Sequence, residues 1–309
     1  MSDAGPRPAL RSLPPSAGLT VQVTAIRAAA DAAAAAAGVR VTAGEDPALL
    51  AAALVVVQQI WQADAADAPV TMAVLRAVTH AGGYCAIAHD VRGDAAPAEA
   101  VVGACIGFLG SRPRSSLHSH IAGVLDAGLG RGVGYALKLD QRAWAAEQGL
   151  ESITWTFDPL VRRNAFFNLM KLGVGVSEYL PDFYGAMEDS VNAGQGSDRL
   201  LVRWPVIAPE HGPAARAITA QPGAVLLDHL PGRPDEAGPI GDTGPSPAWI
   251  RIPADIERLR RERPELAIRW RHAVRSTLGV LLAGPTPLAW VDGMSRDGWY
   301  RLSRVRDDG

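Results

Sequence analysis

Residues 128–138 read GLGRGVGYALK, with glycine at every second position from Gly128 to Gly134 and a helix-forming run behind them. The first amides of a helix have no partner within it, and the helix dipole adds partial positive charge there. Glycines let the backbone approach an oxygen-rich ligand closely or adopt positive φ. The stretch therefore predicts an anion site for a pyrophosphate, with Arg131 as an added cation. The alternative is a tight strand-to-helix turn without a ligand.

Two common phosphate loops do not fit this stretch. A P-loop needs Gly-Lys-Ser or Gly-Lys-Thr at the helix start, and that sequence is absent. The Rossmann fingerprint, Gly-x-Gly-x-x-Gly, lies directly after the first strand and has two residues before its third glycine. In this chain single residues separate Gly130, Gly132 and Gly134, and several strands precede them. The pattern thus points to a different nucleotide or coenzyme fold.

The elements around the glycines predict a mixed α/β sheet. Three consecutive strands precede the glycine run, which separates this order from a doubly wound nucleotide fold, where strands and helices alternate from the start. Helices are expected at 21–37, 46–61, 70–79, 132–148 and 159–172. Strands are expected at 39–44, 83–91, 101–111, 115–125, 152–157, 176–180 and 200–206.

Composition divides the chain into three parts. Residues 1–19 form a Pro- and Ser-containing tail that we expect to be disordered, and residues 20–206 form the main domain. Residues 207–309 hold a Pro- and Gly-rich linker and a smaller α+β extension that docks on the main domain. In this part we expect helices at 252–261 and 264–282 and strands at 223–229, 287–294 and 299–305.

The overall composition is that of a soluble globular chain. Of 309 residues, 48% are hydrophobic and 20% charged, and the net charge of -2 argues against nucleic acid as a partner. We expect no membrane span, no secretory signal and a cytoplasmic location, with Cys85 and Cys105 as buried, reduced thiols. The arginine-rich stretch 256–275 is either a solvated helix face or a surface that attracts an anionic acceptor.

Two sequence motifs resemble those of the GNAT acyltransferase superfamily and stand in the same order as in that family. The resemblance covers about residues 39–206. The first is the strand SHIAGVL followed by GLGRGVGYALK, which is similar to that family's acyl-CoA pyrophosphate loop. The second, NAFFNLMKLG from Asn164 to Gly173, matches its Asn-x6-Lys-Leu-Gly segment, and the strand SITWTF lies between them. LHSH, TWTFDPL and YLPDFYG narrow the resemblance to a bacterial branch of acetyltransferases with a C-terminal extension.

The resemblance implies roles for particular residues. Val124 and Leu125 would pair through their backbone with pantetheine and polarise the thioester carbonyl, and Asn164 would contact the pantetheine arm. The CoA pyrophosphate would be held by backbone amides of Gly130, Arg131, Gly132, Val133 and Gly134. Two positions depart from the family pattern. Leu129 stands where arginine or glutamine is usual, and Leu169 stands where a tyrosine often protonates the leaving thiolate.

Five side chains are candidates for the chemistry. His118 and His120 lie two apart on one strand, so they share a face, and either is a candidate base or a packed structural histidine. Asp158 would orient a substrate ammonium, or cap the helix that follows. Tyr179 and Tyr184 are replacement acids for the missing tyrosine, or walls of the pocket. No Cys, Asp or Glu completes a metal-ligand spacing with the histidines, so no metal is expected.

These features predict an acyl-CoA-dependent N-acyltransferase, using acetyl-CoA or another acyl-CoA as co-substrate. An unidentified small-molecule or peptide amine would attack the thioester directly in a ternary complex. The oligomeric state stays open, although members of the family that the chain resembles often form homodimers. One alternative is an acyl-CoA-binding regulatory protein without transfer activity. Another is an acyl-CoA decarboxylase or hydrolase on the same scaffold.

Overall fold

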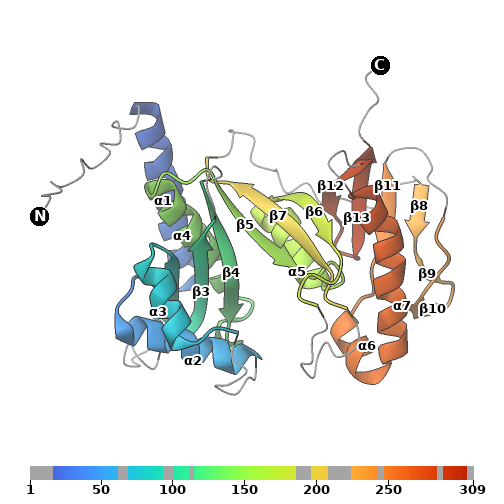
Figure 1. Cartoon of the computed structure of the whole chain (residues 1–309), viewed down its shortest axis with the longest axis horizontal. Helices are drawn as coiled ribbons and strands as arrows, with labels where there is room; N and C mark the ends of the chain where they lie inside the picture. Colours follow the sequence, from blue (N-terminus) through green and yellow to red (C-terminus); the bar gives the residue numbers. More distant parts are fainter. Residues whose placement is uncertain are drawn as a thin grey trace, which may run out of the picture.

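The computed structural model describes residues 17–61, 69–92, 100–110, 115–185, 196–207, 224–241, 247–283 and 288–304 (Figure 1). Seven strands form one sheet in the order β1-β2-β3-β4-β5-β7-β6, in which β4 and β5 are parallel and the other neighbours antiparallel. The mixed α/β fold is thereby confirmed. The strands are β1 Val39–Ala43, β2 Tyr84–Asp90, β3 Val101–Leu109, β4 Ser116–Val124, β5 Ser152–Phe157, β6 Gly175–Leu180 and β7 Arg199–Pro205.

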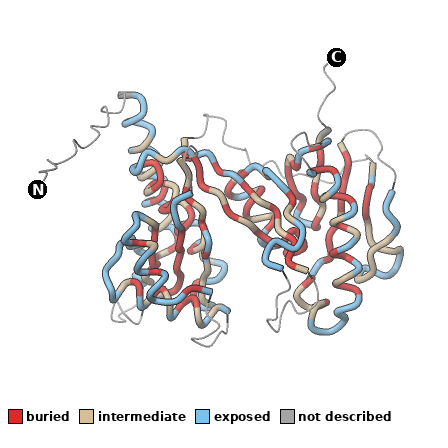
Figure 2. Tube along the Cα trace, viewed as in Figure 1, coloured by how far each residue is buried: buried red, intermediate tan, exposed pale blue. Residues whose placement is uncertain are grey.

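Helices cover both faces of this sheet. One face packs against α4, which α1 covers in turn, and also against α5 and its π-helical continuation η2. The opposite face packs against α2 and α3, and the strands between the helices are largely buried (Figure 2). Cys85 lies buried on the α2 side and Cys105 on the α4 side. The helices are α1 Ala17–Ala37, α2 Pro47–Trp61, α3 Met72–His80, α4 Val133–Glu147, α5 Arg162–Phe166 and η2 Phe167–Leu172.

A second sheet follows in the order β12-β13-β11-β8. Sequence analysis missed β10 and β11, because RPDEA has little strand propensity and AWIR is only four residues long. The division predicted at residue 206 stays a prediction. The elements are β8 Ala224–Leu227, β9 His229–Leu230, β10 Arg233–Ala237, β11 Ala248–Arg251, α6 Ile256–Glu262, α7 Pro264–Val274, the π-helix η3 Arg275–Gly279, β12 Ala289–Met294 and β13 Trp299–Arg304.

Three predicted boundaries are wrong. The helix expected from residue 252 begins at Ile256, because the Asp255 side chain caps it there by accepting from the Arg258 amide. Helix α1 begins at Ala17, so residues 17–19 are helical rather than part of a tail, and residues 1–16 lie outside the described residues. The helix predicted from residue 159 begins at Arg162, because the Asp158 carboxylate accepts a hydrogen bond from the Leu160 amide at 2.9 Å and holds a turn there. Along the described chain, no helix has an apolar run of the length that a lipid bilayer requires.

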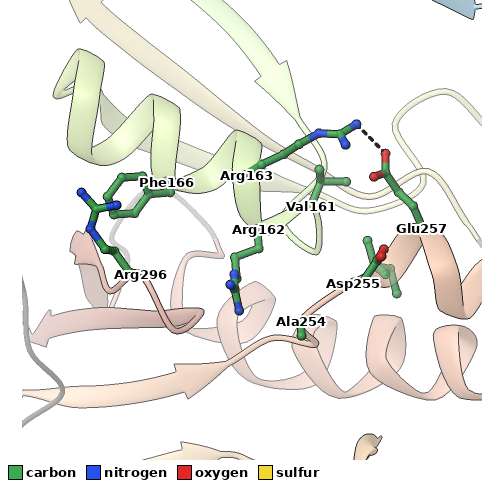
Figure 3. Close-up of a pocket in the computed structure, with 9 residues that line it drawn as sticks. Val161, Arg162, Arg163, Phe166, Ala254, Asp255, Glu257 and Arg296 are labelled. Carbon is green, nitrogen blue, oxygen red and sulfur yellow. Dashed lines mark hydrogen bonds and ion pairs between the residues drawn. The ribbon is translucent and has the colours of Figure 1, made fainter. Parts of the chain in front are cut away.

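A cavity of about 480 Å³ lies where α5 meets the second part of the chain (Figure 3). Arg162, Arg163 and Phe166 line it from α5, and residues 254–257 and Arg296 line it from the other side. Arg296 stacks its guanidinium 5.1 Å from the centre of the Phe166 ring, and Arg163 pairs with Glu257 at 2.8 Å. The cavity is lined by none of the glycine-loop residues.

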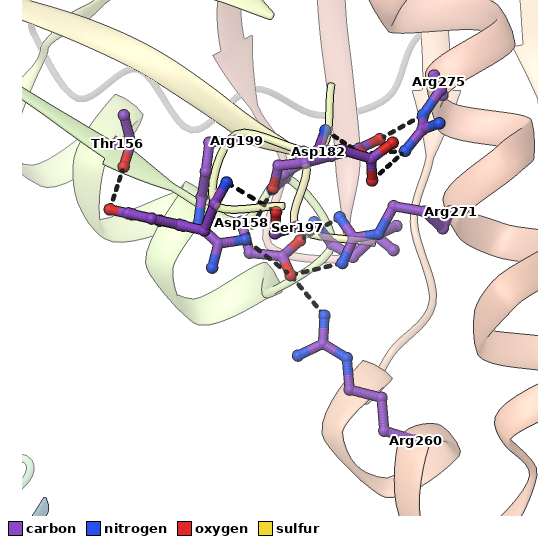
Figure 4. Close-up of polar contacts among 12 residues, drawn as sticks. Thr156, Asp158, Asp182, Ser197, Arg199, Arg260, Arg271 and Arg275 are labelled. Carbon is purple, nitrogen blue, oxygen red and sulfur yellow. Dashed lines mark hydrogen bonds and ion pairs between the residues drawn. The ribbon is translucent and has the colours of Figure 1, made fainter. Parts of the chain in front are cut away.

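Buried ion pairs fasten the second part to the end of β5 (Figure 4). The Asp158 carboxylate accepts two hydrogen bonds from Arg271 of α7, at 2.8 and 2.7 Å, and another from Arg260 of α6. Burial alone would raise the pKa of Asp158, but the charges of the two arginines hold it well below its usual range. The prediction that Asp158 orients a substrate ammonium is therefore wrong, because its oxygens are already engaged by guanidinium groups. Tyr300 adds a hydrogen bond to the Pro159 carbonyl at 2.7 Å.

Removing Arg271 should destabilise the protein strongly. Arg271→Met leaves the buried Asp158 carboxylate without its bidentate partner, and breaking a buried pair in this way costs about 3–5 kcal/mol of unfolding free energy. Urea unfolding at pH 7 measures the loss.

Arg163→Gln is the matched control, because its pair with Glu257 is largely exposed on the arginine side. Its loss should stay below about 1 kcal/mol. Since the pKa of Asp158 is lowered in the folded state, its contribution is present above the unfolded value of about 3.9 and is lost as the pH falls below it. Equal losses for both variants would contradict the assignment.

Candidate functional site

The glycine run forms a loop of free amides at the start of α4. Gly130 and Gly132 have φ values of 74° and 91°, and Gly132 is the residue before the helix. The first bond closing the helix runs from the Ala136 amide to the Gly132 carbonyl, at 2.9 Å. Among the turn and cap contacts of the described chain, the amides of residues 130–135 donate to no backbone acceptor. Six successive donors at a helix N-terminus fit a bound pyrophosphate.

The side chain of Arg131 does not add charge to this loop. Its guanidinium turns away to Asp90, with bonds of 2.6 and 3.1 Å, and also donates to the carbonyls of Ala37 and Gly38. These bonds hold the pKa of Asp90 well below its usual range. The sequence prediction of a fixed cation is wrong in this respect, because a carboxylate neutralises it, and only the Arg131 amide stays available.

Strands β4 and β5 separate beside this loop. They pair at three positions only, Ser116 with Ser152, Leu117 with Ile153 and His118 with Thr154, and then diverge (Figure 1). Residue 119 and residues 121–124 of β4 pair with β3 alone. One edge of β4 therefore faces an opening that runs from His118 toward the glycine loop, and we call this opening the split.

Backbone groups of β4 point into the split at alternate residues. The Leu125 amide donates to the Val102 carbonyl at 2.8 Å, and bonded and non-bonded pairs alternate along an antiparallel ladder. Ala122 and Val124 are therefore the residues that present their amides and carbonyls to the split. The Leu125 carbonyl accepts from the Gly128 amide at 2.8 Å, so both backbone groups of Leu125 are engaged and its predicted pairing with pantetheine is wrong. Ala122 was missed because ladder alternation is not visible in sequence.

His118 and His120 lie where the split begins. His118 Nδ1 is 3.2 Å from Thr154 Oγ1, across the last paired position, and both rings lie against Phe108. The register shift between Ser119 and Ile121 makes His120 the extra residue of a β-bulge. Burial first, and then the nearby His120 and Lys138, lower the pKa of His118 to about 4. Burial also lowers the pKa of His120, and a hydrogen bond with the Pro69 backbone raises it by a smaller amount.

The two tyrosine candidates occupy different environments. The Tyr184 hydroxyl is exposed and lies 3.4 Å from Thr156 Oγ1, on the face of β5 that Thr154 shares. Tyr179 is buried and donates to Asp198 at 2.5 Å. Burial and this carboxylate raise the pKa of Tyr179 far above its usual value. Tyr179 is thus engaged inside the core, and its prediction as an acid is wrong.

The second motif lies on α5 and η2. Asn164 is exposed and its side-chain amide makes no hydrogen bond within the described residues, so it is free for a ligand. Leu169 is buried and supplies no proton donor. Asn168 accepts a bond from Trp155 Nε1 at 3.1 Å and anchors this segment to β5.

Sequence analysis missed Lys138. Its side chain is buried on the α4 side of the sheet and donates to Ser119 Oγ at 3.0 Å and to Gln141 Oε1 at 2.8 Å. The ammonium lies 3.6 Å from the centre of the Trp155 ring. A lysine within the apolar face of the predicted helix was the available signal. Among the described residues, no three His, Cys, Asp or Glu side chains gather as metal ligands would.

His118 should stay uncharged at neutral pH. Because its folded pKa of about 4 lies below the unfolded value of about 6.5, it stabilises the fold fully above pH 6.5 and progressively less as the pH falls toward 4. Urea unfolding of the wild type and of His118→Gln between pH 7 and pH 4 should show a flatter pH dependence for the variant. Parallel curves would place the titration elsewhere.

Comparison with known proteins shows similarity to acetyltransferase structures. No family model and no curated protein sequence matches the chain. Ard1 from Thermoplasma volcanium is 16% identical, with a TM-score of 0.41 over 55% of this chain and 99% of that one. A Desulfovibrio desulfuricans protein assigned to the GNAT family is 15% identical, with a TM-score of 0.43 over 54% and 99%.

The protein yncA from Salmonella typhimurium, solved with its cofactor acetyl-CoA, is 16% identical, with a TM-score of 0.43 over 57% of this chain and 99% of that one. These similarities are of fold, and they cover a little over half of this chain.

Proposed function

We propose that the protein is an acyl-CoA-dependent N-acyltransferase that transfers an acyl group, most simply acetyl, from the coenzyme to an amine. The observation that carries the proposal is the junction of two features: six free amides at the start of α4 and the split between β4 and β5 that opens beside them. The first suits a pyrophosphate. The split suits the extended pantetheine arm of the coenzyme, which carries amide groups, because the backbone groups of Ala122 and Val124 can pair with it as a neighbouring strand would.

The acyl-CoA would supply an acyl group activated as a thioester, and the chain's own residues would do the rest. Amides of residues 130–135 would hold the diphosphate, and the Asn164 amide would contact the arm. His120 would take the proton from the attacking amine, directly or through water, because its lowered pKa keeps the ring unprotonated at pH 7. Thr156 and Tyr184 would form the opposite wall of the acceptor side.

Gly132→Val should weaken CoA binding strongly. A β-branched residue at a φ of 91° is strained, and relief of that strain would move the amides out of line. We expect CoA affinity to fall more than about tenfold, or about 1.4 kcal/mol. A thermal-shift titration with CoA and acetyl-CoA, with NAD and ATP as controls, measures the change.

Gly149→Val supplies the matched control. Gly149 has a φ of 69° just beyond the other end of the same helix, with open space around it. Gly149→Val should lower the free energy of unfolding by an amount similar to Gly132→Val, and its CoA affinity should equal that of the wild type. Unchanged CoA affinity in Gly132→Val would sink the loop assignment.

His120→Ala should lower turnover by roughly a hundredfold, which is at the lower end of what a general base contributes. CoA affinity should change little, because the coenzyme would be held by backbone groups. Thiol release from acetyl-CoA in a panel of primary amines is the measurement. The control is His272→Ala, which replaces an exposed histidine on α7. If His120→Ala turns over as fast as the wild type, His120 is not the base.

Buried Leu169 favours a second candidate, an acyl-CoA-binding protein without transfer activity. Acceptor-dependent thiol release separates the two, since a binder would show a CoA thermal shift and no release with any amine. Thiol release without an acceptor would instead indicate hydrolysis.

A further inference from the structure

Lys138 carries a buried charge that no acid balances. Lysine is almost never fully buried without a partner, yet among the described residues no carboxylate lies within ion-pair distance of its ammonium. Its contacts are the neutral oxygens of Ser119 and Gln141 and the face of Trp155. Desolvating an ammonium costs several kcal/mol, so a buried cation of this kind is a candidate for function.

The ammonium lies at the point where the split opens. His118 and Thr154 form the last pair between β4 and β5, and Ser119 and Trp155 are the next residue of each strand. Lys138 contacts both of these residues from α4. It also lies one helical turn, or about 6 Å, beyond Gly134 of the amide loop. The free amides and the ammonium thus lie on the same side of the sheet, and the ammonium is buried directly behind the point where β4 and β5 part.

The groups around Lys138 leave its charge uncompensated at neutral pH. Burial raises the pKa of Cys105 on β3, so the thiol keeps its proton, and the low pKa of His118 on β4 keeps that ring neutral. On α4 the neighbour is the amide of Gln141, and β5 contributes Trp155. Burial lowers the pKa of Lys138 itself to about 8, which leaves it mostly protonated at pH 7.

Lysine is also a rare choice in this chain. Lysine and arginine together number 30, and only Lys138 and Lys171 are lysines. Arginine therefore makes almost all of the protein's cations, including the buried ones that hold Asp158. A compact ammonium differs from a guanidinium in acting as a point charge on a flexible stem.

We propose that the Lys138 ammonium stabilises the thiolate that leaves when the acyl group is transferred. This inference rests on the proposed function. The amine nitrogen forms the new bond to the acyl carbon, the carbon–sulfur bond breaks, and its electron pair stays on sulfur. The amine's proton passes to His120, and Lys138 keeps its own proton throughout. Leu169 has no donor, Tyr179 is engaged by Asp198, and Tyr184 lies on the other face, whereas Lys138 places its ammonium where β4 and β5 part.

The pKa of the thiol in bound CoA tests the inference without an acceptor. In the wild type it should lie about one unit or more below the free value of about 8.5, a tenfold effect, as read from the ultraviolet absorbance of the thiolate. In Lys138→Met it should return to the free value or above. Lys171→Met, the exposed lysine on η2, should behave as the wild type. Affinity for desulpho-CoA, which lacks the sulfur, should be the same in all three proteins.

The outcomes separate the two proposals. If neither CoA nor desulpho-CoA binds the wild type, the proposed function fails. If both bind and the thiol pKa of the wild type equals the free value, the CoA site stands and the role of Lys138 is overturned, whether or not the variant folds. An equal thiol pKa in the wild type and Lys138→Met also overturns it. With an amine acceptor, Lys138→Met should lower kcat and leave KM for acyl-CoA unchanged.

Discussion

The candidate site depends on the point where the pairing between β4 and β5 ends. After three residue pairs, the two strands leave each other while each keeps its other neighbour, β3 or β7. A strand edge in the middle of a sheet leaves backbone donors and acceptors that need partners. The turn after β4 then adds six more unpaired amides at the start of α4. A ligand that is extended at one end and anionic at the other would satisfy both sets at once.

The second part of the chain is anchored to the half of the sheet that diverges from β4. Arg260 and Arg271 hold Asp158 at the end of β5, and Arg275 pairs with Asp198 just before β7. Since β5 and β7 are neighbours in the sheet, both anchors act on the half of the sheet that diverges from β4. The C-terminal helices thus stabilise the strands on one side of the split through buried ion pairs.

Local signals in the sequence predicted local features well. The glycine run predicted the loop and its free amides, and the alternation of SITWTF predicted β5 to the residue. Features that depend on distant partners were not predictable. Arg131 is neutralised by Asp90, 41 positions away along the chain, and Asp158 is held by Arg271, 113 positions away. Neither pairing produces a periodic pattern in the sequence from which it could be predicted. The roles of Leu125 and Lys138 depend on the ladder and on the strand pair that α4 covers, which appear only once the sheet is assembled.

The two faces of the split have complementary chemistry. His118, His120, Thr154 and Thr156 lie on the face away from α4, where burial lowers the pKa of His120 and the proposed reaction needs a proton acceptor. The amide loop and Lys138 lie toward α4, where positive charge favours an anion. Transfer of an acyl group from a thioester to an amine releases a proton on the side of the amine and negative charge on the sulfur. In the proposed reaction, a sheet opened between two strands would keep these two products apart, because each would develop on the face whose residues stabilise it.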